Sequence, residues 1–349
     1  MTNKSLLARF RPVLIGLGLI CALCGGFAYW VYHSLTTPLT HQAADRIIEI
    51  ESGMGTRGIL VRLWQEGVIS SRFPLLVYLT VNRNQRPLQA GEYQFESPIT
   101  PLKVIEKIQR GQVITHELTI PEGLNIFEVE NLLKNRDSAT PVNGQAVVTE
   151  LRNITLIRDL DPTASTLEGY LFPDTYVYAR NTTSAQLVTQ MVRRFRDVFT
   201  PQFQARAREL GMSVRQVVTL ASLIEKEGKV DEDRALISSV FHNRLKRGMK
   251  LDCDPTFMYA AMLDGTWDGN VNNPQHRRSL SPYNTYLAPG LPPGPIASPG
   301  AKSIQAALYP AESEYIYFVL NEGGKHRFSR TDAEHAAAVA EYRRLQGRR

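Results

Sequence analysis

The sequence predicts an α+β protein built from a single N-terminal transmembrane helix, a small α+β module and a larger α+β domain. Three observations support this class. Residues 13–32 form an uncharged apolar run, residues 44–114 show short strand-then-helix units, and the remaining chain is dense in helix patterns. Because the larger part shows no regular strand–helix–strand alternation, we expect separate helices and strands rather than a parallel sheet. A chain of 349 residues with 43% apolar content is long enough for one large core and a smaller one.

The apolar run VLIGLGLICALCGGFAYWVY is predicted to be a retained membrane anchor. About 20 apolar residues suffice to cross a bilayer. Lys4, Arg9 and Arg11 precede the run and the next charged residue is Asp45, so the positive-inside tendency predicts a cytoplasmic N-terminus and a periplasmic remainder. A cleavable signal peptide is the alternative, but its apolar region usually has about 7–15 residues and ends in small side chains. We therefore expect a single-pass protein of the cell inner (plasma) membrane, with a cytoplasmic tail at 1–12, a transmembrane helix at 13–33 and a linker at 34–43.

The small module at 44–114 shows the strand-then-helix order twice. Its first helix is expected to have Thr56 as N-cap and to stop at Gly67, since glycine readily adopts the left-handed conformation that ends helices. Its second helix has Pro101 at the first position, where a missing N–H costs nothing. The expected elements are strands within 46–55 and 88–95 and helices within 56–67 and 100–111.

The segment 115–349 is predicted to form the larger domain. Residues 116–135 again place a strand, a glycine turn and a helix in order. Residues 136–166 are expected to be irregular, and LEGYLFPDTY (167–176) a short buried segment rich in aromatic side chains. The other expected elements are helices at 184–198, 214–227, 232–251, 301–309 and 332–346, and a buried strand within 314–320.

Composition and motifs exclude several function classes. The net charge of +6 is partly concentrated at the chain ends, and no basic stripe interleaved with aromatics indicates a nucleic-acid partner. Cys21, Cys24 and Cys253 do not form a disulfide framework. The histidines are scattered without an H-E-x-x-H motif, and neither G-x-S-x-G nor S-x-x-K occurs, which argues against a metal hydrolase and a serine hydrolase. We expect no metal and no cofactor.

The stretch VRQVVTLASLIEKEGK (214–229) contains the main candidate acid, Glu225. Apolar residues recur at helical spacing, and at 100° per residue Glu225 points within about 20–40° of Val218 and Ala221. It therefore lies along the expected buried stripe, whereas Glu227 falls at the far margin. Ser213 with Gln216 forms a capping box at the helix start. The residues expected on the polar side are Thr219, Ser222 and Lys226.

Glu225 in this position suits acid catalysis. Partial burial and the negative end of the helix dipole would both raise the pKa of Glu225. A glutamic acid that stays protonated near neutral pH is what a general acid requires. From the residues alone, the alternative is a glutamate at the edge of the stripe that pairs with an arginine.

Two later segments contain polar and aromatic residues that suit a carbohydrate cleft. Sugars present hydroxyl edges and apolar ring faces, which amides, hydroxyls and aromatic rings on proline- and glycine-stiffened loops can bind. Each residue taken singly has a turn or core role as its alternative. The candidate substrate-binding residues are Asn243, Arg244, Asp254, Tyr283, Asn284 and Tyr286.

Five ordered motifs, ASLIEKE, FHNRLKRGMKLDCDPT, SPYNTYLAPGLPPGPIASPG, YIYFV and LEGYLFPDTY, resemble the YceG-like family of endolytic murein transglycosylases. The resemblance covers roughly 44–340. It implies a LysM-like module at 44–114, a catalytic domain at 115–349 and a catalytic role for Glu225 as the first Glu of E-K-E. One common family form has Gln-Ser or Gln-Thr where this chain has Asp252 and Cys253.

The resemblance also implies a lytic reaction on peptidoglycan. Such a lyase cleaves the MurNAc–GlcNAc β-1,4 bond within glycan strands and leaves 1,6-anhydro-MurNAc ends, which would terminate nascent strand elongation. One tuned glutamate suffices, unlike the carboxylate pair of most glycoside hydrolases. The implied partners are peptidoglycan strands, the inner membrane and peptidoglycan synthases. The alternatives are a non-catalytic peptidoglycan-binding scaffold and a muramidase-type hydrolase that uses the same cleft.

Overall fold

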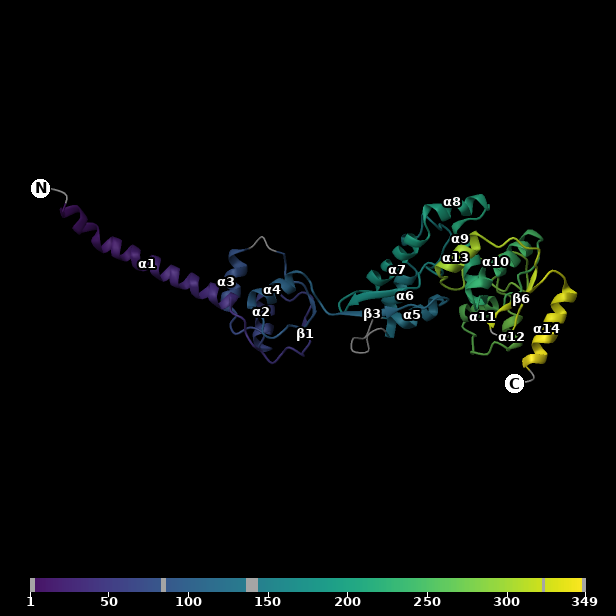
Figure 1. Ribbon diagram of the computed structural model, residues 1–349, viewed down its shortest axis with the longest axis horizontal. Coiled ribbons are helices and arrows are strands. Elements are labelled where there is room, and N and C mark those ends of the chain that lie inside the picture. The colour runs from purple at the N-terminus through teal and green to yellow at the C-terminus, as the bar shows by residue number, and fades with distance from the viewer. Residues whose placement is uncertain (1–3, 83–85, 136–143, 322–323, 347–349) are drawn as a thin grey trace. The chain divides into compact units, whose positions relative to one another are not determined.

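The computed structural model describes residues 4–82, 86–135, 144–321 and 324–346 (Figure 1). Residues 1–3 of the expected cytoplasmic tail and 136–143 of the expected irregular segment lie outside the described residues. The chain divides into two compact units, Met1–His116 with Tyr178–Asn181, and Glu117–Val177 with Thr182–Arg349. The described residues combine helices with small two-stranded sheets and form no extended parallel sheet, which confirms the α+β class.

The first unit combines a long apolar helix with a small mixed fold. Strands β1 and β2 pair antiparallel, with Ile48 opposite Tyr93 and Ile50 opposite Gly91. Helix α1 contains the apolar stretch Val13–Thr36, which is long and apolar enough to cross a membrane. The elements are α1 (Lys4–Thr36), β1 (Ile48–Ile50), α2 (Thr56–Gln65), α3 (Phe73–Val81), β2 (Gly91–Tyr93) and α4 (Pro101–Gln109).

The ends of helices α2 and α4 agree with the predicted caps and stops, with one exception. Thr100 accepts a hydrogen bond from Lys103 N at 3.2 Å and caps α4, and Gly67 has a left-handed φ of +74° after α2. The predicted N-cap of α2 is wrong: Gly55 takes that place in an extended conformation and Thr56 is already helical. Helix α3 was not predicted, because FPLLVYLTV is apolar almost throughout and shows no period.

The second unit is helix-rich and contains the strand pair β5–β6, in which Tyr317 lies opposite Ser329 and Leu320 opposite His326. Strand β3 pairs with β4. Part of the segment expected to be irregular is helical, as α6 and a 3₁₀ turn at Ile154–Leu156. The elements are β3 (Thr115–Thr119), α5 (Ile126–Asn135), α6 (Gly144–Leu151), β4 (Thr175–Ala179), α7 (Ser184–Val198), α8 (Pro201–Glu209), α9 (Val214–Glu227), α10 (Asp231–Lys246), α11 (Asp254–Leu263), α12 (Pro274–Arg277), α13 (Ala301–Leu308), β5 (Tyr317–Leu320), β6 (His326–Ser329) and α14 (Asp332–Gln346).

Helix α9 is the central helix of the second unit and packs against α8, α10, α11 and α13 (Figure 1). The predicted capping box of Ser213 and Gln216 is present. The amphipathic description of α9 is wrong, because every residue from Val217 to Ile224 is buried. Thr219 and Ser222 lie in the interior, where their hydroxyls donate to the carbonyls of Arg215 and Thr219. Glu225 and Glu227 therefore both lie in the last turn of a helix that is buried on all sides.

Candidate active site

An open cleft of about 640 Å³ lies in the second unit, between the ends of α9 and α10, the start of α11 and the β5–β6 hairpin with α14. It brings together three of the predicted substrate-binding residues, Arg244, Asp254 and Tyr286. It also contains two polar residues that the sequence did not single out as part of the site, Glu227 and Arg277. Further side chains that line it include Lys229, Asp252, Tyr317, His326, His335 and Arg343.

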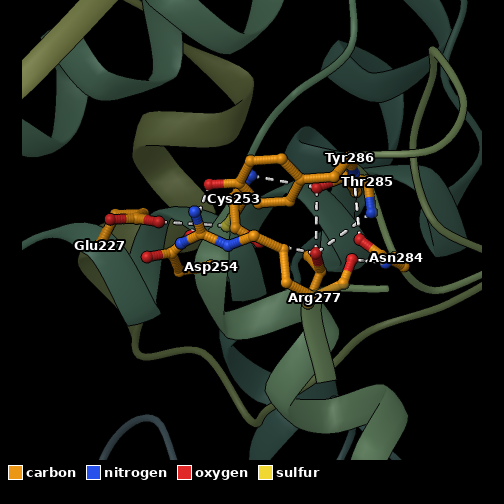
Figure 2. Close-up of polar contacts among 8 residues, drawn as sticks. Glu227, Cys253, Asp254, Arg277, Asn284, Thr285 and Tyr286 are labelled. Carbon is orange, nitrogen blue, oxygen red and sulfur yellow. Dashed lines mark hydrogen bonds and ion pairs between the residues drawn. The ribbon is translucent and has the colours of Figure 1, made fainter. Parts of the chain in front are cut away.

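Glu227, the last residue of α9, presents its carboxyl group at this cleft. Its Oε1 accepts a hydrogen bond from the Cys253 thiol at 3.2 Å (Figure 2). Desolvation raises the pKa of Glu227 to about 7; the negative charge of Asp254 adds to this, whereas the Cys253 bond and Lys229 oppose it. A large fraction of Glu227 is therefore protonated near neutral pH, as a general acid requires.

Asp254, Arg277 and Tyr286 form a hydrogen-bonded set beside Glu227 (Figure 2). Asp254 Oδ1 accepts from the Tyr286 hydroxyl and from Arg277 Nη2, the latter at 3.1 Å. The guanidinium of Arg277 also lies over the rings of Tyr286 and Phe257, 5.0 and 5.4 Å from their centroids. Burial and the bond to Asp254 raise the pKa of Tyr286. The set holds an aromatic face and a carboxylate rigidly at the cleft wall.

The turn before α11 positions this set. Asp252 has a φ of +49°, an uncommon left-handed conformation for a residue other than glycine, and pairs with Arg244 at 2.9 Å. Cys253 is buried, and its N–H donates to Thr285 Oγ1 at 3.0 Å. Of the two positions that depart from the common family form, Asp252 lines the cleft, and the buried Cys253 contacts Glu227 through its thiol.

Glu225 has a different environment. Its side chain is only 6% exposed, which confirms the expected burial. Oε1 accepts from Arg234 Nη1 at 3.0 Å, and Oε2 accepts from the N–H of Gly300 at 2.9 Å. Glu225 is not among the residues that line the cleft. The structure therefore matches the alternative that the sequence left open, a glutamate paired with an arginine.

Glu225 belongs to a charge cluster that joins α9, α10 and the segment before α13. Arg234 also contacts Asp231, and its Nη1 donates to Ser303 at 2.6 Å. Burial and the charge of Glu225 raise the pKa of nearby Glu122. An added Cβ at Gly300 would lie 2.0 Å from a carboxylate oxygen of Glu122, so a larger residue here would displace the Glu122 side chain.

Three of the predicted binding residues do not line the cleft. Asn243 donates from Nδ2 to the carbonyls of Ser313 and Tyr315, each at 2.9 Å. The Tyr283 ring packs against Tyr259, 5.1 Å between centroids. Asn284 is 2% exposed. These residues shape the loops around the cleft rather than its surface.

Asn284→Ala is expected to lower stability strongly. Asn284 Nδ2 donates to the carbonyls of Arg277 and Ser279, each at 2.9 Å, and its Oδ1 accepts from Tyr286 N. Buried groups that lose their partners cost about 1–3 kcal/mol each, so we expect a loss of at least about 2 kcal/mol in the free energy of unfolding. Denaturant unfolding measures it. The control Ser281→Ala removes one long bond of 3.4 Å to Tyr283 N and should cost less than about 1 kcal/mol. An Asn284→Ala protein as stable as this control would contradict the structural role.

Glu168 is a second carboxyl group whose pKa burial raises to about 7. Its Oε2 accepts from Ile126 N and from the Tyr259 hydroxyl, each at 2.9 Å, and Oε1 has no hydrogen-bond partner among the described residues. Glu168 is 4% exposed and is not among the residues that line the cleft. Within the described ranges, no three His, Cys, Asp or Glu side chains converge as a metal site requires.

Glu227 was not predicted at the cleft, because the pattern of α9 was interpreted as one buried stripe. Residues two apart on a helix point about 200° apart, so a buried position for Glu225 implied an exposed position for Glu227. The signal that was available is the run VVTLASLI, which has only two small hydroxyl residues among apolar ones. Such a run is typical of a helix buried on all sides. On such a helix both glutamates are expected to contact protein.

The fold and the cleft define a class: a helix-rich α+β protein in which a carboxylic acid faces a carboxylate, tyrosine and arginine set in an open cleft. The chain belongs to the YceG-like family, whose sequence model matches residues 48–341.

Three relatives show how far the similarity extends. The endolytic murein transglycosylase of Bacillus subtilis is 30% identical over 336 residues, which cover 91% of this chain and 90% of the relative. The endolytic murein transglycosylase of Streptococcus pneumoniae strain D39 is 27% identical over 328 residues, 84% of this chain and 58% of the longer relative. The crystal structure of a yceG-like protein from Listeria monocytogenes superposes with a TM-score of 0.56 at 31% identity, covering 84% of this chain and 98% of that one.

Proposed function

We propose that this protein is an endolytic peptidoglycan transglycosylase that uses Glu227 as its acid and base. The observation that carries the proposal is the Glu227 carboxyl group, whose pKa of about 7 lets it exist in both protonation states at the open cleft. The names of the B. subtilis and S. pneumoniae relatives support murein as the substrate. Glu225, the acid that the sequence favoured, is the competing assignment; its pairing with Arg234 argues against it.

The proposed reaction needs one group that first gives and then takes a proton. Protonated Glu227 donates its proton to the glycosidic oxygen as the bond from that oxygen to C1 of N-acetylmuramic acid breaks, and the N-acetylglucosamine end leaves as an alcohol. The Glu227 carboxylate then takes the proton of the C6 hydroxyl of the same muramic residue, whose oxygen bonds to C1. A 1,6-anhydro ring forms, Glu227 is protonated again, and no water is consumed.

The neighbouring residues have distinct proposed roles. The Tyr286 ring, held by Asp254 and covered by Arg277, offers a flat face for a sugar ring. The Asp254 charge favours the neutral form of Glu227 and also faces the positive charge that develops on the sugar ring in the transition state. The proposed role of Arg244 is to hold the wall of the cleft in place, because its guanidinium donates hydrogen bonds to backbone carbonyls.

A muramidase-type hydrolase is the second candidate. Asp254 faces the same cleft as Glu227, and two carboxyl groups are the usual equipment of a hydrolase that activates water or forms a covalent intermediate. The hydrogen bonds of Asp254 to Tyr286 and Arg277 occupy its Oδ1, which favours a supporting role. A non-catalytic peptidoglycan-binding scaffold has no use for an acid in the Glu227 environment.

The proposal includes the placement of the enzyme. Helix α1 anchors it in the inner membrane by one pass, with 1–12 cytoplasmic and the chain after 34–43 periplasmic, where the murein lies. The segment 44–114 is proposed to be the LysM-like module and 115–349 the catalytic domain. Cleavage within nascent strands would end their elongation, which makes peptidoglycan synthases the proposed partners.

Product analysis of the wild-type protein tests the function. The full chain, incubated with purified sacculi or uncrosslinked glycan strands, is expected to release muropeptides that end in 1,6-anhydro-N-acetylmuramic acid. Mass spectrometry distinguishes them, because they are lighter by one water than hydrolytic products and take up no oxygen from isotopically labelled water. Reducing ends that carry the label would establish the hydrolase instead, and binding without any product would establish the scaffold.

A further inference from the structure

We propose that a pocket on the first unit binds an anionic phospholipid of the outer leaflet around α1, with its phosphate between Arg57 and Arg72. The pocket, which we call the α2–α3 pocket, has a volume of about 450 Å³ and lies between α2 and α3. Its lining includes Arg57, Leu60, Trp64, Arg72, Phe73 and Leu76. The inference rests on the proposed membrane anchoring by α1, and it adds a lipid site that the proposed reaction does not need.

The contact between α1 and α3 determines the depth of the pocket relative to a bilayer. The ring of Phe73, the first residue of α3, lies 6.3 Å from the rings of both Phe27 and Trp30 of α1. At 1.5 Å per residue, a hydrocarbon core about 30 Å thick that begins at Val13 ends about 20 residues later, near residue 33. Phe27 and Trp30 are then about 9 and 5 Å inside the outer boundary. Phe73 lies at the same depth.

The side chains beside Phe73 are those expected at a membrane interface. Phe73 is 51% exposed and Trp64 is 47% exposed, so two large aromatic rings face out of the protein on this side. Tryptophan is enriched where acyl chains meet headgroups, because its ring is apolar and its N–H is polar. A lipid bilayer that surrounds α1 covers both rings without any further partner.

The charges of the pocket complement a phosphate. Arg72 lies over the Trp64 ring, 5.1 Å from its centroid, and Arg57 also lines the pocket. In the described part of the chain neither arginine forms an ion pair, whereas Arg62 on the same helix as Arg57 pairs with Glu66 at 3.2 Å. Two exposed guanidinium groups match the oxygens of a phosphodiester. The apolar side chains of Leu60, Phe73 and Leu76 in the same lining suit the upper part of an acyl chain.

Fluorescence quenching in lipid vesicles tests the depth. The chain has three tryptophans, Trp30, Trp64 and Trp267, so double Trp→Phe variants of the full chain leave one reporter each. In vesicles with brominated acyl chains, Trp64 is expected to be quenched as Trp30 is, and Trp267 of the second unit is expected to be quenched much less. Quenching of Trp30 without Trp64 would overturn the lipid pocket and leave the anchor intact. An unquenched Trp30 would instead refute the anchor itself.

The second measurement tests the phosphate site. With Trp64 as sole reporter, brominated phosphatidylglycerol is expected to quench more strongly than brominated phosphatidylcholine at equal content. Arg57→Gln with Arg72→Gln should reduce this preference by roughly fivefold per arginine, from about 1 kcal/mol for each charge at an anionic surface. The matched control Arg62→Gln should keep it. Equal quenching by the two lipids in the wild type, or a preference that survives the double substitution, would overturn the proposal.

Discussion

Glu227→Gln is expected to fold normally and to release no anhydro-muropeptides above background. Glutamine keeps the shape of the side chain and an oxygen that accepts from Cys253, but it has no acidic proton to give. General acid catalysis is typically worth about 10²–10⁴-fold, and loss of the sole acid and base should reach or exceed the upper end. Mass spectrometry of products from glycan strands measures the rate, and circular dichroism checks the fold.

Glu225→Gln is the matched control, two residues away on the same helix. It weakens the buried pair with Arg234, so we expect a loss of stability of up to about 3 kcal/mol. The cleft residues are unchanged, so turnover should continue below the lowered melting temperature. A folded but inactive Glu225→Gln protein together with an active Glu227→Gln protein would contradict our assignment and restore the one made from the sequence.

The dependence on pH gives the same assignment a second readout. The first step requires protonated Glu227, so kcat/KM should fall as pH rises through about 7. Stability should change in the same direction. The folded pKa of Glu227 lies above the unfolded value of 4.5, so the folded state holds more protons between these values and loses stability as pH rises from about 5 to 8. Glu227→Gln should remove this part of the loss, and Glu168, with its own raised pKa, should retain the rest.

Arg244→Met is expected to cost about 3–5 kcal/mol in the free energy of unfolding. Arg244 is 8% exposed, and its guanidinium donates to Asp252 at 2.9 Å. It also lies 5.1 Å from the Tyr317 ring centroid. Methionine fills much of the volume but leaves these acceptors unpaired. The backbone carbonyls that lose a donor are those of Lys250, Leu251 and Ile316.

Arg330→Met is the control for this substitution. Like Arg244, Arg330 has a carboxylate and an aromatic ring beside it, Glu314 at 3.7 Å and Tyr315 at 5.7 Å, but its side chain is exposed. Exposed ion pairs contribute about 0–1 kcal/mol, so this variant should unfold at nearly the wild-type denaturant concentration. If both substitutions cost the same, the buried position of Arg244 would not be the reason for its effect.

Helix positions and helix caps were predictable where they depend on residues that are close together in the sequence. The helix at 184–198, the capping box of Ser213 and Gln216 and the stop of α4 after its capped start depend on backbone groups within a turn or two. Such contacts are present in the sequence as fixed spacings. Helices without a clear period, such as α3 and α11, were missed, because a helix that is apolar on most of its faces has no polar face to mark the helical spacing.

The candidate site was predictable only in part. Asp254 and Tyr286 reach the cleft as expected, because residue types that bind sugars are concentrated in these loops. Asn284 and Tyr283 come from the same loop, but Asn284 is buried and Tyr283 packs against Tyr259. Nothing in their local sequence distinguishes them from Tyr286. Which side chains of a loop face the cleft depends on the residues from other segments that pack against the loop, such as Tyr259 against Tyr283.

The sequence by itself determined the membership in the YceG-like family, the α+β class, the apolar helix at the N-terminus and the segment that contains the proposed acid. Only the tertiary structure distinguished the environments of the two acids of E-K-E, on which the proposed assignment of the acid rests. Arg234 from α10 and the Gly300 N–H pair with Glu225, whereas Cys253 and Asp254 from the start of α11 leave Glu227 desolvated at the cleft. The physical reason is that the protonation of a carboxyl group depends on burial and on charges that come from distant parts of the chain.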